Sequence, residues 1–184
     1  MVQVVVGVVL TAVLGGLLVP FVKDRMDRRK QSLESSLELL EVIATGLWTY
    51  WALAHRVAYY GQQGERSAQR YDAALRDWDS ADAWKNGRDI RIQVSRARRL
   101  IPQYQPELDA TQRKVVGGFD EKVEALRQSG TPAEWHHFFE SLMGEEREAI
   151  ENVLERLTKE LRTQKLIPST LDGPHWPWAR SRSI

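Results

Sequence analysis

The sequence predicts an all-α protein in which an N-terminal single transmembrane helix is followed by a four- to five-helix cytoplasmic bundle. Two observations carry this prediction: residues 2–22 form an uncharged apolar run, and residues 31–60 carry a heptad repeat. At 184 residues the chain suits one modest domain plus an appendage. The expected parts are a transmembrane anchor at 1–22, a basic juxtamembrane segment at 23–30, a helical bundle domain at 31–166 and a Pro/Trp/Arg tail at 167–184.

The apolar run VQVVVGVVLTAVLGGLLVPFV is long enough to cross a bilayer as a helix of about 30 Å. A cleaved signal peptide is the alternative, but it normally begins with basic residues and ends at a small-residue cleavage site. Here the basic residues follow the run, which predicts a single-pass anchor with its N-terminus outside and the bundle in the cytoplasm. The residues expected to contact anionic lipid headgroups are Lys23, Arg25, Arg28, Arg29 and Lys30.

Small residues recur on one face of the predicted anchor, at Gly7, Thr11, Gly15 and Gly16. Such spacing lets two membrane helices approach closely, which predicts helix packing within a homo-oligomer. The alternative is that glycine is simply common in membrane helices.

Residues 31–60 are expected to form one long helix with a seam of apolar residues in four-three alternation. The seam comprises Leu33, Leu37, Leu40, Ala44, Leu47, Trp51, Ala54 and Ala58. Within it, residues 42–54 carry no charge and are too few to span a membrane, which favours a buried or interfacial segment. Entry of this segment into the membrane is the alternative. The glycines of GQQG, residues 61–64, are expected to end the helix.

The middle of the chain predicts two more helices around a turn at Asn86-Gly87. Residues 90–101 fit a strand over a few positions, but Ile90, Val94 and Ile101 fit a helical stripe over more of them, so a helix is expected.

The last third predicts two helices with a clear boundary between them. Residues 107–128 form an amphipathic pattern that Gly117 and Gly118 weaken. Thr131 and Glu134 then suit a capping box that opens a helix reaching about residue 165.

The arginines of residues 88–99 need a partner. The first interpretation is a charge match inside the bundle with the glutamates between 133 and 161. The second is anionic lipid, and nucleic acid is the weakest because the net charge is only +1. The residues of this charge-partner or lipid face are Arg88, Arg91, Arg98 and Arg99.

No catalytic motif is visible in the sequence. The chain has no cysteine, which excludes a thiol nucleophile and a zinc–thiolate site. Glu134 and His137 form only half of a di-iron carboxylate motif, because no second E-x-x-H pair is present. We therefore expect no enzyme activity, no metal and no cofactor, and no small-molecule substrate is indicated.

Tryptophans fall into two groups. Trp48, Trp51, Trp78 and Trp135 lie on or beside apolar stripes and are expected in the core. The tail residues Trp176, Trp178 and Arg180 have the composition of a membrane interface. The alternative is a tail that packs on the bundle or stays unfolded.

The expected function is a membrane-anchored, non-enzymatic scaffold or regulatory subunit for assembly at the bacterial inner membrane. Its partners would be the bilayer and either a second copy or another protein. The alternative is a membrane-acting effector that permeabilises or forms pores, as in lysis or anti-phage defence. The nineteen arginines against seven lysines are typical of a GC-rich bacterial genome.

Overall fold

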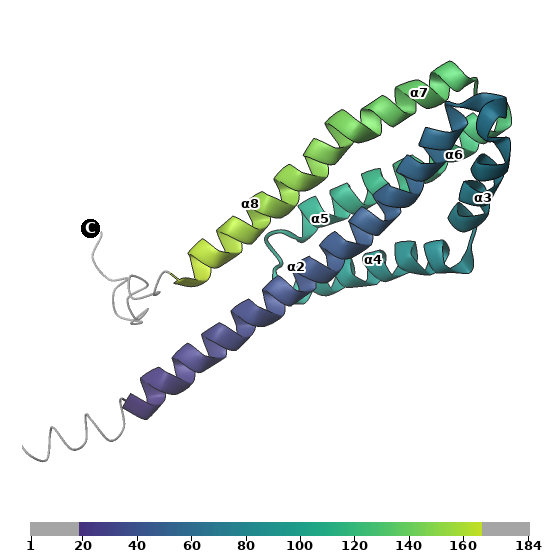
Figure 1. Cartoon of the computed structure of the whole chain (residues 1–184). Helices are drawn as coiled ribbons and strands as arrows, with labels where there is room; N and C mark the ends of the chain where they lie inside the picture. The colour runs from purple at the N-terminus through teal and green to yellow at the C-terminus, as the bar shows by residue number, and fades with distance from the viewer. Residues whose placement is uncertain (1–18, 167–184) are drawn as a thin grey trace, which may run out of the picture. The chain divides into compact units, whose positions relative to one another are not determined.

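A computed structural model describes residues 19–166 (Figure 1). Residues 34–158 form one compact unit, called the bundle unit here, and the described residues outside it are assigned to a second unit. The predicted anchor lies almost wholly outside the described residues, and the tail lies entirely outside them. Among helices within 19–166, none is both long enough and apolar enough to span a membrane.

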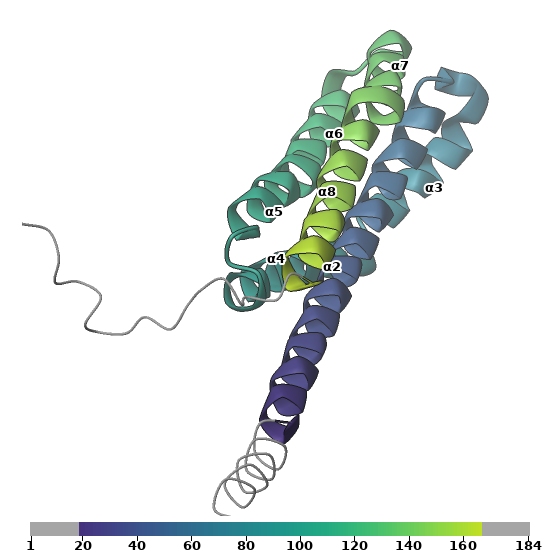
Figure 2. The same ribbon diagram turned by 90° about the vertical axis from the view of Figure 1, so that its left-hand side faces the viewer.

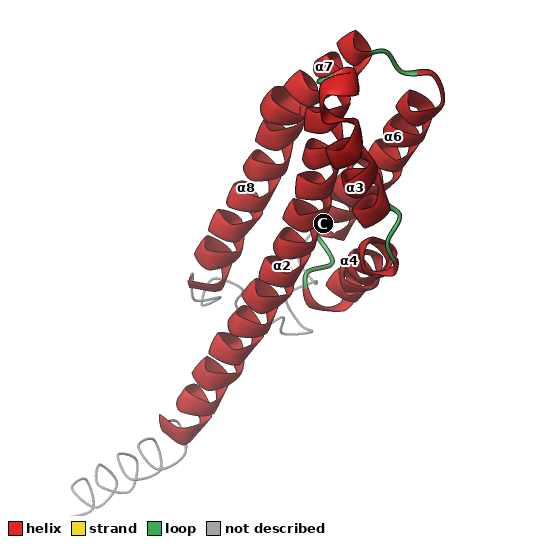
Figure 3. Cartoon of the chain, turned by 45° about the vertical axis from the view of Figure 1, so that its right-hand side comes forward, coloured by secondary structure: helices red, strands yellow, loops and turns green. Residues whose placement is uncertain are grey.

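The prediction of an all-α protein is confirmed for the described residues, which contain no strand (Figure 3). The helices are α2 (Val19–Gly61), η2 (Gly64–Ser67), α3 (Ala68–Trp78), α4 (Ala81–Leu100), α5 (Gln105–Gln112), η3 (Arg113–Gly117), α6 (Gly118–Ser129), α7 (Pro132–Ser141), η4 (Leu142–Glu146) and α8 (Arg147–Leu166). The π-helical turns η3 and η4 join their flanking helices without a break. Apart from the short η2, the described chain therefore consists of five continuous helices, within the predicted number.

Helix α2 has part of the predicted seam. Leu40, Leu47, Ala54 and Ala58 are buried as expected, but before Ala58 the other buried line lies one position earlier than predicted. This second line comprises Ser36, Ile43, Tyr50 and Val57. The predicted Leu37, Ala44 and Trp51 are only half-buried, because α2 packs against several helices rather than one coiled-coil partner.

One face of residues 42–54 belongs to the bundle core. Ile43, Leu47, Tyr50 and Ala54 are all buried. Packing within the bundle unit accounts for the apolar residues on this face, whereas Val42, Thr45, Thr49 and Ala52 are exposed.

The end of α2 at Gly61 is as predicted. Gly64 adopts the left-handed conformation, with φ of +57°, which reverses the chain into η2 and α3. A Cβ atom at Gly61 would lie 2.6 Å from Trp135 Cδ2, so this position also needs glycine for packing.

The predicted turn at Asn86-Gly87 is wrong, because both residues lie inside α4. The break falls earlier, where Ser80 caps α4 by accepting a hydrogen bond of 3.2 Å from the backbone of Ala83. The helix predicted at 90–101 is confirmed to Leu100, and Ile101 forms its C-terminal cap.

The capping box is confirmed. Thr131 accepts from the Glu134 backbone at 3.3 Å, and the Glu134 carboxylate accepts from the Thr131 backbone at 2.7 Å.

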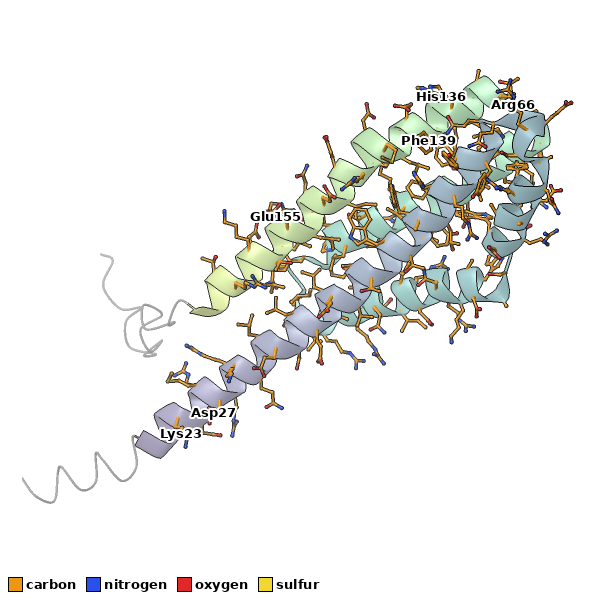
Figure 4. The ribbon with its side chains drawn as sticks, viewed as in Figure 1. Lys23, Asp27, Arg66, His136, Phe139 and Glu155 are labelled. Carbon is orange, nitrogen blue, oxygen red and sulfur yellow. The ribbon has the colours of Figure 1, made fainter. Side chains whose placement is uncertain are left out.

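Contacts between side chains hold the bundle unit together. Arg56 of α2 pairs with Asp77 of α3, and Arg156 of α8 pairs with Glu107 of α5. Phe139 of α7 packs against His55 and Tyr59 of α2 (Figure 4). Within this unit, the helix α7–α8 is flanked by α2 and by α5–α6 (Figures 1 and 2).

The described part of the second unit includes the predicted juxtamembrane segment. Lys23, Arg25, Arg28 and Lys30 are exposed, and Arg29 is half-buried. Arg28 pairs with Asp24 one turn earlier at 2.8 Å.

A candidate binding cleft and basic ridge on α4

An open cleft of about 570 Å³ lies between α2, α4 and the η3–α6 segment. Tyr50, Gly87 and Val116 supply buried lining, and Asp120 is half-buried beside them. The exposed lining comprises Asp79, Ala81, Trp84, Lys85, Arg88 and Arg91. Two neighbouring hollows share residues with this cleft, so it is the central part of a longer depression.

Two glycines let the helices around the cleft approach closely. A Cβ atom at Gly46 would lie 2.5 Å from Ile90 Cγ1, and one at Gly87 would lie 3.2 Å from Val116 Cγ1. The Asn86 side chain donates a hydrogen bond of 3.1 Å to the Gly46 carbonyl, which fixes α4 against α2. The two residues that resembled a turn signal therefore serve helix packing.

A hydrogen-bonded pair connects α2 to α6 in the cleft. The Tyr50 hydroxyl donates to Asp120 Oδ1. Burial, that hydrogen bond and the nearby carboxylate all raise the pKa of Tyr50 well above its usual value. Burial also raises the pKa of Asp120, against the opposing effects of the Tyr50 hydrogen bond and the Arg91 charge. Tyr50 is therefore a proton donor held in place, and it is not poised to act as a base.

The outer side of the cleft is basic and carries an exposed aromatic ring. Trp84 is 71% exposed, which is unusual for so large an apolar side chain. Lys85, Arg88 and Arg91 are also exposed, and none of them forms an ion pair within the described part of the chain.

The basic character continues along α4 beyond the cleft. Trp84, Arg88, Arg91, Ser95 and Arg98 follow each other at spacings of four, three, four and three, and all are exposed. We call these five residues the α4 ridge. At helical rise the ridge is about 21 Å long, and Arg99 lies exposed beside its end.

The structure does not show the predicted charge match between these arginines and the C-terminal helix. Of the four predicted residues, Arg91 lies near Asp120 of α6, and none forms an ion pair within residues 19–166. The described ion pairs of the C-terminal helix with other elements join Arg156 to Glu107 and Glu146 to Lys114. The helix α5–η3 satisfies these charges, and the α4 arginines remain available on the surface.

The half-motif Glu134/His137 is used for structure at its first residue. The hydrogen bonds from the Thr131 backbone and hydroxyl lower the pKa of Glu134 and hold its carboxylate at the helix start. His137 is exposed on α7. Within the described residues there is no group of three or more His, Asp or Glu side chains arranged to hold a metal ion.

Of the four tryptophans expected in the core, Trp78 and Trp135 are buried, whereas Trp48 and Trp51 are half-buried. The exposed Trp84 was not expected at a site. The signal for Trp84 was its spacing of four and seven residues from Arg88 and Arg91 on one helix face.

Some predicted site residues lie outside the described part of the chain. They are the membrane-packing residues Gly7, Thr11, Gly15 and Gly16 and the tail residues Trp176, Trp178 and Arg180.

Comparison of the chain with protein-family models, with curated proteins and with solved structures finds no match. The residues of the cleft and the α4 ridge offer unpaired cations, an exposed indole and a fixed hydrogen-bonded acid, a composition typical of a surface that binds an anionic partner.

Proposed function

We propose that this protein is a membrane-anchored, non-enzymatic scaffold or assembly subunit at the bacterial inner membrane. In this proposal residues 1–22 cross the membrane, residues 23–30 meet anionic headgroups, and the cytoplasmic bundle recruits a protein partner. The uncharged run at 2–22 and the basic segment after it support the anchor.

The observation that carries the recruiting role is the α4 ridge. Exposed tryptophan and arginine are the residue types that most often dominate the binding energy of protein interfaces. The ridge places one such tryptophan beside three arginines. All four side chains are exposed, and the three arginines form no ion pair in the described residues. The bundle itself gains little from this arrangement, because an exposed indole and unpaired guanidinium groups contribute little to its stability.

The alternative of a membrane-permeabilising effector has weaker support than the scaffold. It depended in part on residues 42–54 as a membrane-active aromatic segment. Ile43, Leu47 and Tyr50 of this segment are buried in the bundle. One face of the segment is therefore engaged in packing.

The membrane part is tested by cysteine labelling, since the chain has no native cysteine. Single variants Gln3→Cys and Ala125→Cys are treated in intact cells with a membrane-impermeant maleimide; Ala125 is exposed on α6. Labelling at position 3 alone is expected. Labelling at position 125 would place the bundle on the other side of the membrane.

The recruiting role is tested by photo-cross-linking from the ridge. Ser95→Cys, exposed on the ridge, is coupled to a photoreactive maleimide in spheroplasts, and the exposed Ser129→Cys of α6 is the matched control. A discrete cross-linked species is expected from position 95, and it should disappear when Arg91→Glu and Arg98→Glu are added. Equal, diffuse cross-linking from both positions would remove the ridge as a recruiting surface.

A further inference from the structure

The α4 ridge carries more positive charge than the bundle unit uses. Arg88, Arg91 and Arg98 are exposed and form no ion pair in the described residues. A partner for these arginines needs a surface of opposite charge that is itself without ion pairs.

Helix α8 presents such a surface. Glu148, Glu151 and Glu155 recur at spacings of three and four residues, and all are exposed. We call these three residues the α8 stripe. Glu151 accepts from Arg147 Nε at 3.0 Å within the same helix, whereas Glu148 and Glu155 form no ion pair in the described residues. Figure 4 shows Glu155 on the outer side of α8.

The two surfaces match in spacing as well as in sign. Arg91 and Arg98 are seven residues apart on α4, and Glu148 and Glu155 are seven residues apart on α8. Both pairs therefore extend about 10 Å along a helix. When the two helices align, two cations meet two carboxylates at once.

Each surface also has an exposed apolar residue before its charged pair. Trp84, which lines the cleft, precedes Arg91, and Met143, which is 41% exposed, precedes Glu148. In a parallel alignment both apolar residues lie towards the same end, Trp84 seven residues before Arg91 and Met143 five residues before Glu148.

This complementarity is not satisfied inside one chain, since no described ion pair joins α4 to α8. It can be satisfied between chains, because every copy carries both surfaces. Anchoring copies in one membrane would also raise their effective concentration. Anionic lipid would meet the positive charge of the ridge, but it would leave the acidic stripe with its matching spacing unexplained.

We propose that the α4 ridge binds the α8 stripe of a second copy of this chain. This inference rests on the proposed scaffold function and names the partner that the bundle recruits. Reciprocal contacts between two copies give a closed dimer, and contacts that do not close give a longer assembly.

The test is charge reversal and its rescue in the full-length protein, purified in mild detergent. One variant carries Arg91→Glu with Arg98→Glu, and the other carries Glu148→Arg with Glu155→Arg. Each changes only exposed residues without a described ion pair, so the helix content in circular dichroism should match that of the wild type. Association is measured by light scattering and by cross-linking over a range of protein concentration.

The wild type is expected to self-associate, and each variant alone should associate at least about tenfold more weakly, because like charges then face each other. Mixing the two variants should restore association, since each then offers the charge that the other lacks. A single chain carrying all four substitutions should also recover. Added salt should weaken the wild-type assembly.

The matched control is Arg70→Glu with Arg76→Glu on α3, two exposed arginines without a described ion pair, which should leave association unchanged.

The inference is overturned if the wild type is monomeric, or if mixing the two charge-reversed variants does not restore association. A ridge that cross-links a different protein would overturn it while leaving the scaffold function intact. If the Arg91/Arg98 variant loses only its binding to phosphatidylglycerol vesicles, the occupant is lipid and the inference is wrong. If the wild-type protein does not fractionate with the membrane, the proposed function itself is overturned.

Discussion

The indole Nε1 of Trp51 donates a hydrogen bond of 3.0 Å to the backbone carbonyl of Leu142, which fastens α2 to the C-terminal helix. Leu142 is fully buried and begins the π-helical turn η4. A π turn relaxes the regular i→i+4 ladder of a helix, and the indole gives one of its carbonyls a donor from another helix. The contact also explains why a half-buried tryptophan lies at the edge of the α2 seam.

Replacing Trp51 with Phe should lower the free energy of unfolding by about 1–2 kcal/mol, because the buried carbonyl loses a donor and the ring becomes smaller. Urea unfolding of the full-length chain, followed by circular dichroism, measures the change. Trp48→Phe is the matched control, since Trp48 is also half-buried and contacts Trp51 edge to face. An equal loss in both variants would show that ring size, rather than the hydrogen bond, sets the effect.

Replacement by alanine should change the free energy of unfolding in opposite directions at Gly46 and Gly118. At Gly46 the new Cβ would lie 2.5 Å from Ile90 Cγ1, so Gly46→Ala should destabilise the bundle by about 1–3 kcal/mol. At Gly118 nothing lies within 4 Å, so Gly118→Ala should stabilise it by about 0.5–1 kcal/mol through helix propensity.

The effects of changing Gly46 and Ile90 on the free energy of unfolding should not be additive. Because the clash at Gly46 is with Ile90, adding Ile90→Ala to Gly46→Ala should cost less than the sum of the two single changes. Thermal unfolding of the four proteins gives the comparison. Additive costs would mean that a neighbour other than Ile90 limits the space.

Local signals in the sequence predicted local structure well. The capping box at Thr131 and the end of α2 at Gly61 are confirmed, because both depend on chemistry within one turn of helix. The helical choice at residues 90–101 is also confirmed, since the apolar stripe ran beyond what a strand would need.

Features that depend on neighbours in space were harder to predict. Asn86-Gly87 has the composition of a turn, and only the structure shows that Gly87 faces Val116 and Asn86 bonds to α2. The two π turns left little signal beyond one glycine within each, Gly117 in η3 and Gly144 in η4. The cleft was not foreseen either, because Tyr50 and Asp120 are seventy residues apart.

Tyr50→Phe should weaken the bundle at neutral pH by about 1–3 kcal/mol, because the half-buried Asp120 carboxylate loses its donor. The Tyr50 hydrogen bond lowers the Asp120 pKa, so its removal should raise that pKa further above the usual value. A carboxyl whose pKa is higher in the folded than in the unfolded state stabilises the fold while it is protonated. This contribution is lost as the pH rises through the folded-state pKa. The difference between variant and wild type should therefore shrink as the pH falls towards about 4.

Urea unfolding at a series of pH values measures that difference. Tyr59→Phe is the control, since Tyr59 is exposed and its hydroxyl has no described partner. It should change stability by less than about 0.5 kcal/mol. A Tyr50→Phe deficit that stays constant down to acid pH would mean that lost packing, not the carboxylate, is responsible.

His55 should make the bundle sensitive to mild acid. Its ring stacks on Trp51 and contacts Phe139, and burial lowers its pKa. The unfolded chain binds the proton more readily, with a pKa of about 6.5, so the contribution of neutral His55 is present above that pH. This contribution is lost as the pH falls from about 6.5 through the folded-state pKa of His55.

His55→Leu should remove this part of the acid destabilisation, while His137→Leu, at an exposed position, should leave it in place. Urea unfolding between about pH 5 and pH 8 measures the free energy of unfolding of each variant. If the wild type and His55→Leu lose the same stability as the pH falls, another group governs the response.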